Sequence, residues 1–207
     1  MAPRRPVVVF DLGGVLIDWN PRHLYRKLFA GDEAGMERFL AQVCSPAWNL
    51  TLDAGRDWAE AIAELVAQHP EQAALITAYH QRWPEMLGGP IAGSVAILDE
   101  LRQSGTPLYA LTNWSDETFA IALRLYDFLG WFEGIVVSGR ERLVKPDPRL
   151  FRILLDRHGL AAGDVVYIDD NPANAEAAGR LGMHPIHFTT APALRANLGE
   201  LGLLAGH

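Results

Sequence analysis

The chain has 207 residues and a formal net charge of −7, with 18 Lys and Arg against 25 Asp and Glu. This length suits a core domain with a smaller inserted one. The acidic balance argues against broad nucleic-acid binding, which needs a clustered positive surface. A single cysteine, Cys44, excludes an internal disulfide and a cysteine-based metal cluster. No apolar run reaches membrane-spanning length, and the start of the chain up to Pro6 lacks a secretory pattern, so we expect a cytoplasmic protein that does not bind membranes.

Short apolar runs that end in polar residues recur along the chain. The first covers 7–10, and later ones cover 107–111, 134–137 and 165–168, with a less regular fifth at 185–188. Segments with helical periodicity lie between them, at 95–102, 151–159 and 173–181. Strands that alternate with helices predict an α/β core with a doubly wound, Rossmann-like parallel sheet covered on both faces.

The interval from residue 18 to residue 89 interrupts this alternation. Apolar residues recur there at helical spacing, for example Trp58, Ile62 and Leu65, and glycines and prolines punctuate the pattern. We therefore predict a helical cap over 18–89, inserted after the first strand. The α/β core then consists of residues 1–17 and 90–207.

Polar residues stand where the apolar runs end, and in an open parallel sheet this edge binds ligands. Asp11, Thr112 and the pair Asp169 and Asp170 follow strands, and Lys145 lies in a later loop. One carboxylate can attack, a hydroxyl and an ammonium can hold an anion, and two further carboxylates can hold a divalent metal. Each residue alone also fits a turn, a helix cap or a solvated surface. The combination favours an active site.

Four stretches resemble the motifs of the haloacid dehalogenase superfamily. They are FDLGGVLID at 10–18, LTN at 111–113, KPDP at 145–148 and VYIDDNPAN at 166–174. Their order and spacing cover most of the chain, and the helical insertion falls where family members carry a cap domain. The resemblance implies a hydrolase with an aspartate nucleophile, most often a phosphatase.

The resemblance also implies roles for individual residues. Asp11 would attack phosphorus and form an aspartyl-phosphate. Thr112 and Asn113 would bind the phosphoryl group, and Lys145 would neutralise its charge and orient Asp11. Metal ligands are implied as well, for which Mg²⁺ is the expected ion. They are the Asp11 carboxylate, the Gly13 backbone carbonyl, and Asp170, which would bind directly, with Asp169 helping directly or through water.

Gly13 departs from the commonest phosphatase pattern. Most phosphatases that this chain resembles place a second aspartate there, which protonates the leaving group and later activates water. Loss of a positioned acid typically costs on the order of 10²–10⁴ in rate unless another group compensates. His23 and His80 are two candidates for that group elsewhere in the chain.

Two other functions remain open from the sequence. A 2-haloacid dehalogenase would use the same aspartate through an ester intermediate, and it needs no acid at Gly13. Dehalogenases of the family, however, place a tyrosine at this position and replace part of the acid pair, which this chain keeps as Asp169 and Asp170. The third possibility is a weakly catalytic regulator that binds a phosphorylated ligand.

The cap would select the substrate and exclude water. Trp19 follows the first motif and Trp114 the second, so these two are the candidates for lining the entrance. Candidates for contacting an anionic substrate group are Arg22, His23, Arg56 and Arg82. We expect a small phosphorylated molecule, such as a sugar phosphate, as the substrate, and a monomer or homodimer.

Overall fold

The core is built on five parallel strands, in a computed structural model that describes residues 6–204. The start of the chain considered above for a secretory pattern lies almost wholly outside the described residues. β1 (Val7–Phe10) is central, between β4 (Leu108–Thr112) and β6 (Val165–Asp169). β5 (Gly134–Val137) and β7 (His184–His187) form the edges, and all four strand pairings are parallel. The predicted parallel sheet is confirmed.

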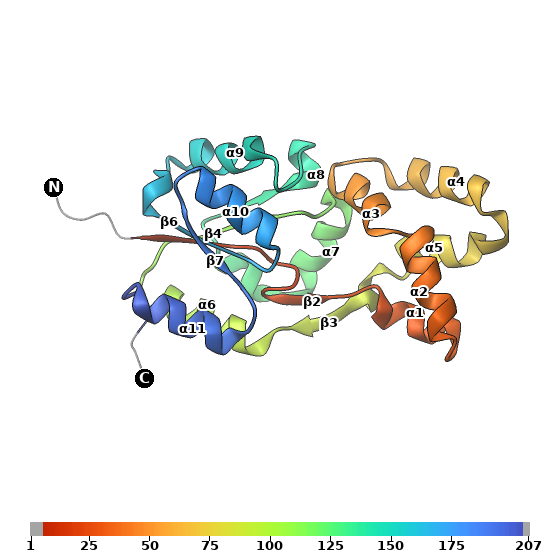
Figure 1. The fold of residues 1–207 in the computed structure, drawn as a ribbon, viewed down its shortest axis with the longest axis horizontal. Coiled ribbons are helices and arrows are strands. Elements are labelled where there is room, and N and C mark those ends of the chain that lie inside the picture. Colours follow the sequence, from red (N-terminus) through yellow and green to blue (C-terminus); the bar gives the residue numbers. More distant parts are fainter. Residues whose placement is uncertain (1–5, 205–207) are drawn as a thin grey trace.

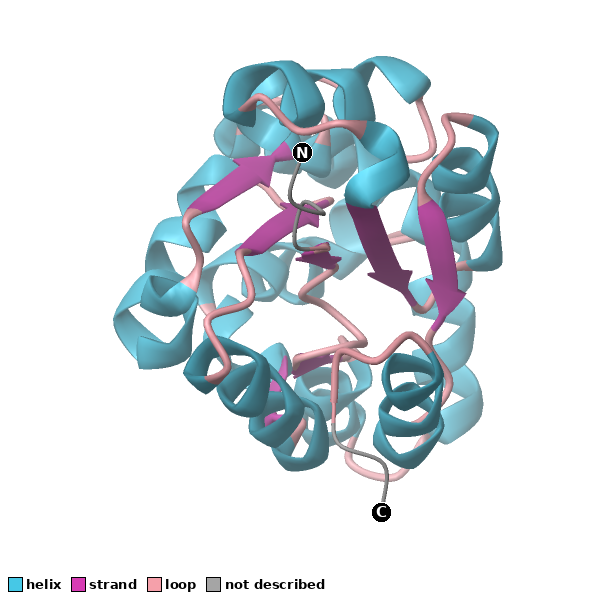
Figure 2. Ribbon diagram, turned by 90° about the vertical axis from the view of Figure 1, so that its left-hand side faces the viewer, coloured by secondary structure: helices cyan, strands magenta, loops and turns pink. Residues whose placement is uncertain are grey.

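Helices cover both faces of this sheet, as Figure 2 shows. Val8 and Phe10 point to one face and belong to the larger hydrophobic cluster. Val7 and Val9 point to the other face, because successive strand residues alternate. The helices over the Val8 face are α6 (Ala92–Gln103), α7 (Asp116–Leu125) and α11 (Ala191–Glu200). Those over the Val9 face are α9 (Pro148–His158) and α10 (Pro172–Arg180).

The insertion after β1 is helical, as predicted, and lies at one end of the core (Figure 1). Aspartate or serine side chains at Asp32, Ser45 and Asp57 accept hydrogen bonds from the first turns of three of its helices, which fixes where those helices begin. The cap helices are α1 (Arg22–Phe29), α2 (Glu33–Gln42), α3 (Pro46–Asp53), α4 (Trp58–Gln68) and α5 (Ala73–Gln81). The remaining short elements are α8 (Ser138–Glu141) and 3₁₀ turns at Pro70–Gln72, Trp83–Met86, Asp127–Trp131 and Ala162–Asp164.

A two-stranded antiparallel ribbon joins the two parts, and the sequence did not predict it. It pairs β2 (Ile17–Trp19) with β3 (Leu87–Pro90) and has a register shift between Asp18 and Trp19. Strands this short, one of them containing two glycines, carry no readable alternation of apolar and polar residues. The two predicted limits of the cap, residues 18 and 89, both lie within this ribbon. The exact limits of the cap remain a prediction.

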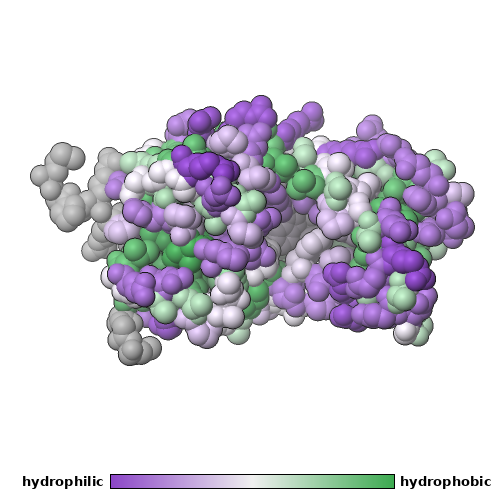
Figure 3. Space-filling model, in the orientation of Figure 1, coloured by the Kyte–Doolittle hydropathy of each residue, from purple (hydrophilic) through white to green (hydrophobic). Residues whose placement is uncertain are grey.

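The surface of the cap that faces the viewer in Figure 3 is largely hydrophilic, and the molecule is hollowed between core and cap. Over the described residues, no helix is both long and apolar enough to cross a bilayer.

Candidate active site

Asp11 and Lys145 form a buried ion pair at the carboxyl end of the sheet. Asp11 follows β1, and Lys145 lies in the loop before α9. The Lys145 Nζ atom is 2.9 Å from Asp11 Oδ1, and the two residues are 2% and 7% exposed. The Leu12 backbone N–H also donates to Asp11 Oδ1, at 2.7 Å. One oxygen of Asp11 is thus fixed, while no described residue donates a hydrogen bond to Oδ2.

Asp169, at the end of β6, holds Lys145 from the opposite side. Its Oδ2 accepts hydrogen bonds from Lys145 Nζ at 2.7 Å and from the Tyr167 hydroxyl at 2.6 Å. The Asn174 side chain donates to both oxygens, at 3.0 and 3.2 Å, and the Asn171 N–H donates to Oδ1 at 2.9 Å. With the Leu111 carbonyl at 3.0 Å, the three Lys145 donors are satisfied. Asp169 is therefore mainly a support for Lys145.

Asp170 differs from Asp169 because its side chain is exposed. Its carboxylate lies against Gly14, where a side-chain carbon would collide with it. Gly14 has a φ of +75°, a conformation that glycine adopts at little cost. The loop after β1 thus needs glycine here both for its turn and for the approach of Asp170.

Three carboxylates converge at this point. One oxygen each from Asp11, Asp169 and Asp170 lie within 4.8 Å of one another. Carboxylate oxygens are the ligands that Mg²⁺ prefers, and a cation would offset repulsion between the three acids. Asp11 Oδ2 and the exposed Asp170 carboxylate are the oxygens best placed for a direct bond, because both Asp169 oxygens already accept hydrogen bonds. The donor set fits the expected ion.

Burial sets the protonation of these groups. It raises the pKa of Asp11 to about 7, since the loss of water outweighs the attraction of Lys145, and the charges of Asp169 and Asp170 add repulsion. Burial alone would lower the pKa of Lys145, but attraction by Asp11 and Asp169 outweighs it and leaves that pKa above its usual value. Burial, and then Asp169, raises the pKa of Asp170. A bound cation would favour the ionised carboxylates.

Thr112, in β4, and Asn113, which follows that strand, lie beside this cluster. Thr112 is 1% exposed and ends the strand. The Asn113 side chain donates to the Lys145 carbonyl at 3.2 Å and accepts from the Lys145 backbone N–H at 2.8 Å. Asn113 thus positions the Lys145 loop, in addition to its predicted place near the substrate.

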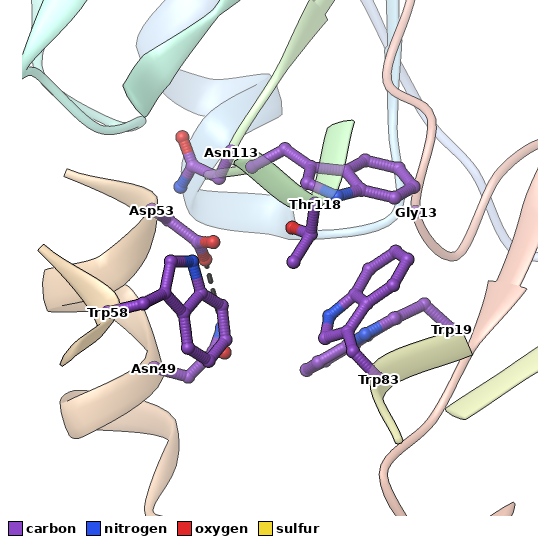
Figure 4. A pocket seen from close by; sticks show the side chains of 9 residues that line it. Gly13, Trp19, Asn49, Asp53, Trp58, Trp83, Asn113 and Thr118 are labelled. Atoms are coloured by element: carbon purple, nitrogen blue, oxygen red, sulfur yellow. Dashed lines mark hydrogen bonds between the residues drawn. The ribbon is translucent and has the colours of Figure 1, made fainter. Parts of the chain in front are cut away.

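A cavity of about 390 Å³, including space open to solvent, lies between core and cap. Its wall reaches Gly13 and Asn113, which adjoin the charged cluster, but includes none of the charged residues of that cluster. Figure 4 shows its walls: rings from Trp19, Trp58 and Trp83 face polar side chains from core and cap. Trp114 also lines it, so both tryptophans predicted for the entrance are in its wall. The complete lining is Gly13, Trp19, Asn49, Asp53, Trp58, Trp83, Asn113, Trp114 and Thr118. Among these lining residues none is basic.

Two hydrogen bonds tie the cap to the core around this cavity. Trp58 Nε1 donates to Ser115 Oγ at 3.0 Å, and Ser138 Oγ donates to the Asp53 carbonyl at 2.6 Å. Gly55, with a φ of +84°, follows directly and packs so closely on the Gly139 carbonyl that a side-chain carbon would need the backbone to shift. The cap is therefore closed over the cavity.

The arrangement matches a known family. A family model for haloacid dehalogenase-like hydrolases matches residues 6–182. The chain belongs to this family. The resemblance predicted from the four motifs is thereby confirmed, and the chain is a hydrolase of the haloacid dehalogenase type.

Individual relatives of this haloacid dehalogenase-like hydrolase differ in their reactions. A sesquiterpene phosphatase of Aspergillus oryzae is 25% identical over 193 residues, which are 93% of this chain and 94% of that protein. An (S)-2-haloacid dehalogenase of a Pseudomonas species is 24% identical over 86% of this chain and 74% of its own. A family enzyme of Bacteroides thetaiotaomicron, solved with magnesium and inorganic phosphate, superimposes with a TM-score of 0.68 at 20% identity, over 90% of this chain and 96% of that one. At this identity, the similarity to the Bacteroides enzyme shows that the two proteins share a fold.

Several side chains of this hydrolase lie elsewhere than expected. Arg22, Arg56 and Arg82 pair with Glu37, Glu64 and Glu85, and none of the three lines the cavity. His23 pairs with Asp18 at 2.9 Å, and His80 pairs with Glu117 at 2.7 Å. Neither histidine is among the residues that line the cavity.

Two functional side chains were not found by sequence reasoning. Tyr167 stands two residues before Asp169, and the alternation of strand side chains was the signal that could have placed them on one side. Asp53 ends a cap helix and reaches the cavity only because the cap docks on the core. Local sequence carries no signal for that docking.

Proposed function

We propose that the chain is a Mg²⁺-dependent phosphatase that hydrolyses a small phosphate monoester through an aspartyl-phosphate on Asp11. The observation that carries this proposal is the asymmetric environment of Asp11. Lys145 and the Leu12 N–H hold Oδ1, and no described donor occupies Oδ2. A carboxylate fixed by one oxygen and open at the other is oriented for attack by the open one.

The residues around Asp11 have matching roles. Lys145 places a positive charge beside the nucleophile, where it offsets charge on the transferring phosphoryl group. Thr112 ends the adjacent strand and supplies a hydroxyl donor, while Asp169 keeps the Lys145 ammonium in place. A Mg²⁺ ion held by Asp11 and Asp170, with the Gly13 carbonyl and Asp169 nearby, would bring further positive charge to the phosphate oxygens.

The cavity indicates the kind of leaving group. Its wall has four tryptophans, Asn49, Asn113 and Thr118, and no lysine or arginine. Flat aromatic rings with a few amide and hydroxyl groups suit an uncharged leaving group with an apolar face, such as a sugar ring or a hydrocarbon alcohol. A second phosphate or carboxylate on the substrate would find no cation in this wall. We therefore propose a monoester with an uncharged leaving group.

The acid pair favours phosphate transfer over dehalogenation. Halide displacement by Asp11 requires no metal, whereas the single charge of Lys145 offsets only part of the repulsion between three carboxylates within 4.8 Å of one another, and a divalent cation would offset the rest. Asp170 is exposed towards the site and makes no described ion pair, which leaves it available for that cation.

The test is release of 4-nitrophenol from 4-nitrophenyl phosphate, with Mg²⁺ and with a chelator. We expect turnover that the chelator abolishes and that Asp11→Asn lowers by on the order of 10⁴ or more, because the amide is a poor nucleophile. Asp156→Asn, at an exposed carboxylate on α9, is the matched control and should turn over like the wild type. Halide release from a 2-haloacid, without phosphatase turnover, would overturn the proposal in favour of the dehalogenase.

A further inference from the structure

Gly13 leaves an open space where the usual acid would project. A side-chain carbon built on Gly13 meets no atom within 4 Å, and Gly13 lines the cavity. The position has no positive φ that would demand glycine. The backbone here could therefore carry a side chain, and the space that a carboxyl group would occupy is continuous with the cavity.

Asp53 supplies a carboxyl group to the same cavity from the opposite wall. It is the one acidic residue among the described residues that line the cavity. In Figure 4 its carboxylate points inward from the end of α3. Asn49 Nδ2 donates to Asp53 Oδ2 at 3.0 Å, and the Tyr79 hydroxyl donates to Asn49 Oδ1 at 3.0 Å. This chain of hydrogen bonds fixes the carboxyl group and leaves further lone pairs free.

The position of Asp53 over the core is also fixed. Its backbone carbonyl accepts a 2.6 Å hydrogen bond from Ser138 Oγ, and Ser138 Oγ in turn accepts from the Trp114 backbone N–H at 2.8 Å. Gly55 lies directly on the Gly139 backbone. The segment that carries Asp53 is therefore seated on the core, and the carboxyl group keeps its place relative to the strand ends.

The surroundings of Asp53 favour a protonated carboxyl group near neutral pH. The pKa of Asp53 is raised to about 7, mainly by burial and also by the negative charge of Asp11, while the Ser115 backbone N–H and Lys145 act in the opposite direction. The other titratable group that faces it is Tyr79, which stays neutral because burial raises its pKa well above the usual value. A pKa near the working pH is what a proton donor and acceptor requires.

We propose that Asp53 is the general acid and general base of this hydrolase, supplied by the cap in place of the side chain that Gly13 lacks. The inference rests on the proposed phosphatase function. In the first half-reaction Asp11 Oδ2 bonds to phosphorus, the ester P–O bond breaks, and Asp53 gives its proton to the departing oxygen. In the second, the Asp53 carboxylate takes a proton from water, the water oxygen bonds to phosphorus, and the P–O bond to Asp11 breaks.

The test compares two leaving groups in Asp53→Asn, which keeps the size and one acceptor of the side chain. With an alkyl phosphate, whose alkoxide needs a proton, we expect kcat to fall on the order of 10²–10⁴. With 4-nitrophenyl phosphate, whose phenolate departs unprotonated, we expect a fast burst of one nitrophenol per site, followed by slow turnover. The burst arises because the aspartyl-phosphate still forms and then waits for an unactivated water.

Two further variants complete the test. Gly13→Asp in the Asp53→Asn background should restore alkyl phosphate turnover, because the space at Gly13 accepts the side chain. Asp57→Asn, an exposed cap residue that begins α4, is the matched control and should behave like the wild type, because asparagine caps as well as aspartate. A merely structural Asp53 would give equal losses of kcat/KM for both leaving groups, no burst and no rescue, whereas the proposed role lowers kcat/KM for the alkyl phosphate only.

The outcomes separate the two proposals. Unchanged kinetics in Asp53→Asn, or an equal loss of kcat/KM for both leaving groups without a nitrophenol burst, overturns the role of Asp53 and leaves the phosphatase intact. Absence of any Mg²⁺-dependent turnover in the wild type overturns the phosphatase proposal, and the role of Asp53 falls with it. A thermal melt of Asp53→Asn that matches the wild type shows that a lost activity is not lost folding.

Discussion

The core and the cap contribute different kinds of groups to one cavity. The core contributes charges that many hydrogen bonds fix: Lys145 is held by Asp11, Asp169 and the Leu111 carbonyl. The cap contributes aromatic rings and a single carboxyl group, and its described hydrogen bonds to the core include those of Trp58, the Asp53 carbonyl and His80. The proposed nucleophile and metal ligands therefore lie at the strand ends of the sheet, whereas the cap supplies much of the cavity wall and the proposed proton donor.

The largest expected effect separates a buried core lysine from an exposed cap lysine. In Lys145→Met, Asp11 and Asp169 lose their shared cation while remaining buried. We expect the free energy of unfolding at pH 8 to fall by about 3–5 kcal/mol, and phosphatase turnover to be lost. Denaturant unfolding measures the first quantity, and nitrophenol release the second.

Lys27→Met is the matched control in the cap. Lys27 pairs with Glu85 at 2.9 Å, but its side chain is 57% exposed. The loss should be below about 1 kcal/mol, because solvent screens such a pair. If both variants lose the same free energy of unfolding, burial does not determine how much these two lysines stabilise the protein. For Lys145→Met, part of the loss should return at pH 5, where the uncompensated carboxylates can protonate.

The core site could be predicted from sequence because its geometry follows from topology. Asp11, Thr112 and Asp169 end three adjacent parallel strands, and parallel strands bring their carboxyl ends to one edge. The resemblance implied that Asp170 binds the metal directly, with Asp169 helping, but sequence did not indicate that Asp169 would hold Lys145. Asp169 faces inward and accepts hydrogen bonds from Lys145 and Tyr167, whereas Asp170 is exposed. Two adjacent aspartates look alike in sequence.

The cap was predictable only as a set of amphipathic helices. Helical periodicity identified its apolar residues, but it does not report how helices dock on the core. Asp53 reaches the cavity through contacts with Ser138 and Asn49 that are 85 and 4 residues away in sequence. The histidines His23 and His80 were singled out for their chemistry, and both form ion pairs outside the cavity.

A smaller effect per residue is expected on the pH dependence of stability, to which the core contributes through Asp11 and the cap through Asp53. Asp11 and Asp53 have folded-state pKa values of about 7, above the usual value of 3.8. Between these values the folded protein binds more protons than the unfolded one, so stability is greatest at low pH and falls as pH rises towards 7. Without a divalent cation, we expect each of the two groups to contribute a loss of about 2.5 kcal/mol between pH 5 and pH 8, measured by denaturant unfolding.

Magnesium binding and the substitution Asp53→Asn separate the contribution of Asp11 to this pH dependence from that of Asp53. Because a cation favours the ionised form of Asp11, Mg²⁺ should raise the melting temperature more at pH 8 than at pH 5. Asp53→Asn should remove the cap's share of the pH dependence and leave the Mg²⁺ response. An equal Mg²⁺ shift at both pH values would contradict the raised pKa of Asp11. Asp170→Asn should abolish the shift at either pH.

The smallest expected effect tests the tether between cap and core. Trp58→Phe keeps an aromatic ring in the cavity wall and removes the Nε1–H that donates to Ser115 Oγ. Loss of one such bond costs about 1 kcal/mol, which corresponds to a rise of about fivefold in KM if the closed cap is the form that binds substrate. Trp48→Phe is the matched control, because the Trp48 Nε1 atom is buried without a hydrogen-bond partner among the described residues. A larger rise in KM for Trp48→Phe than for Trp58→Phe would show that ring packing within the cap, rather than its hydrogen bond to the core, keeps the cavity closed.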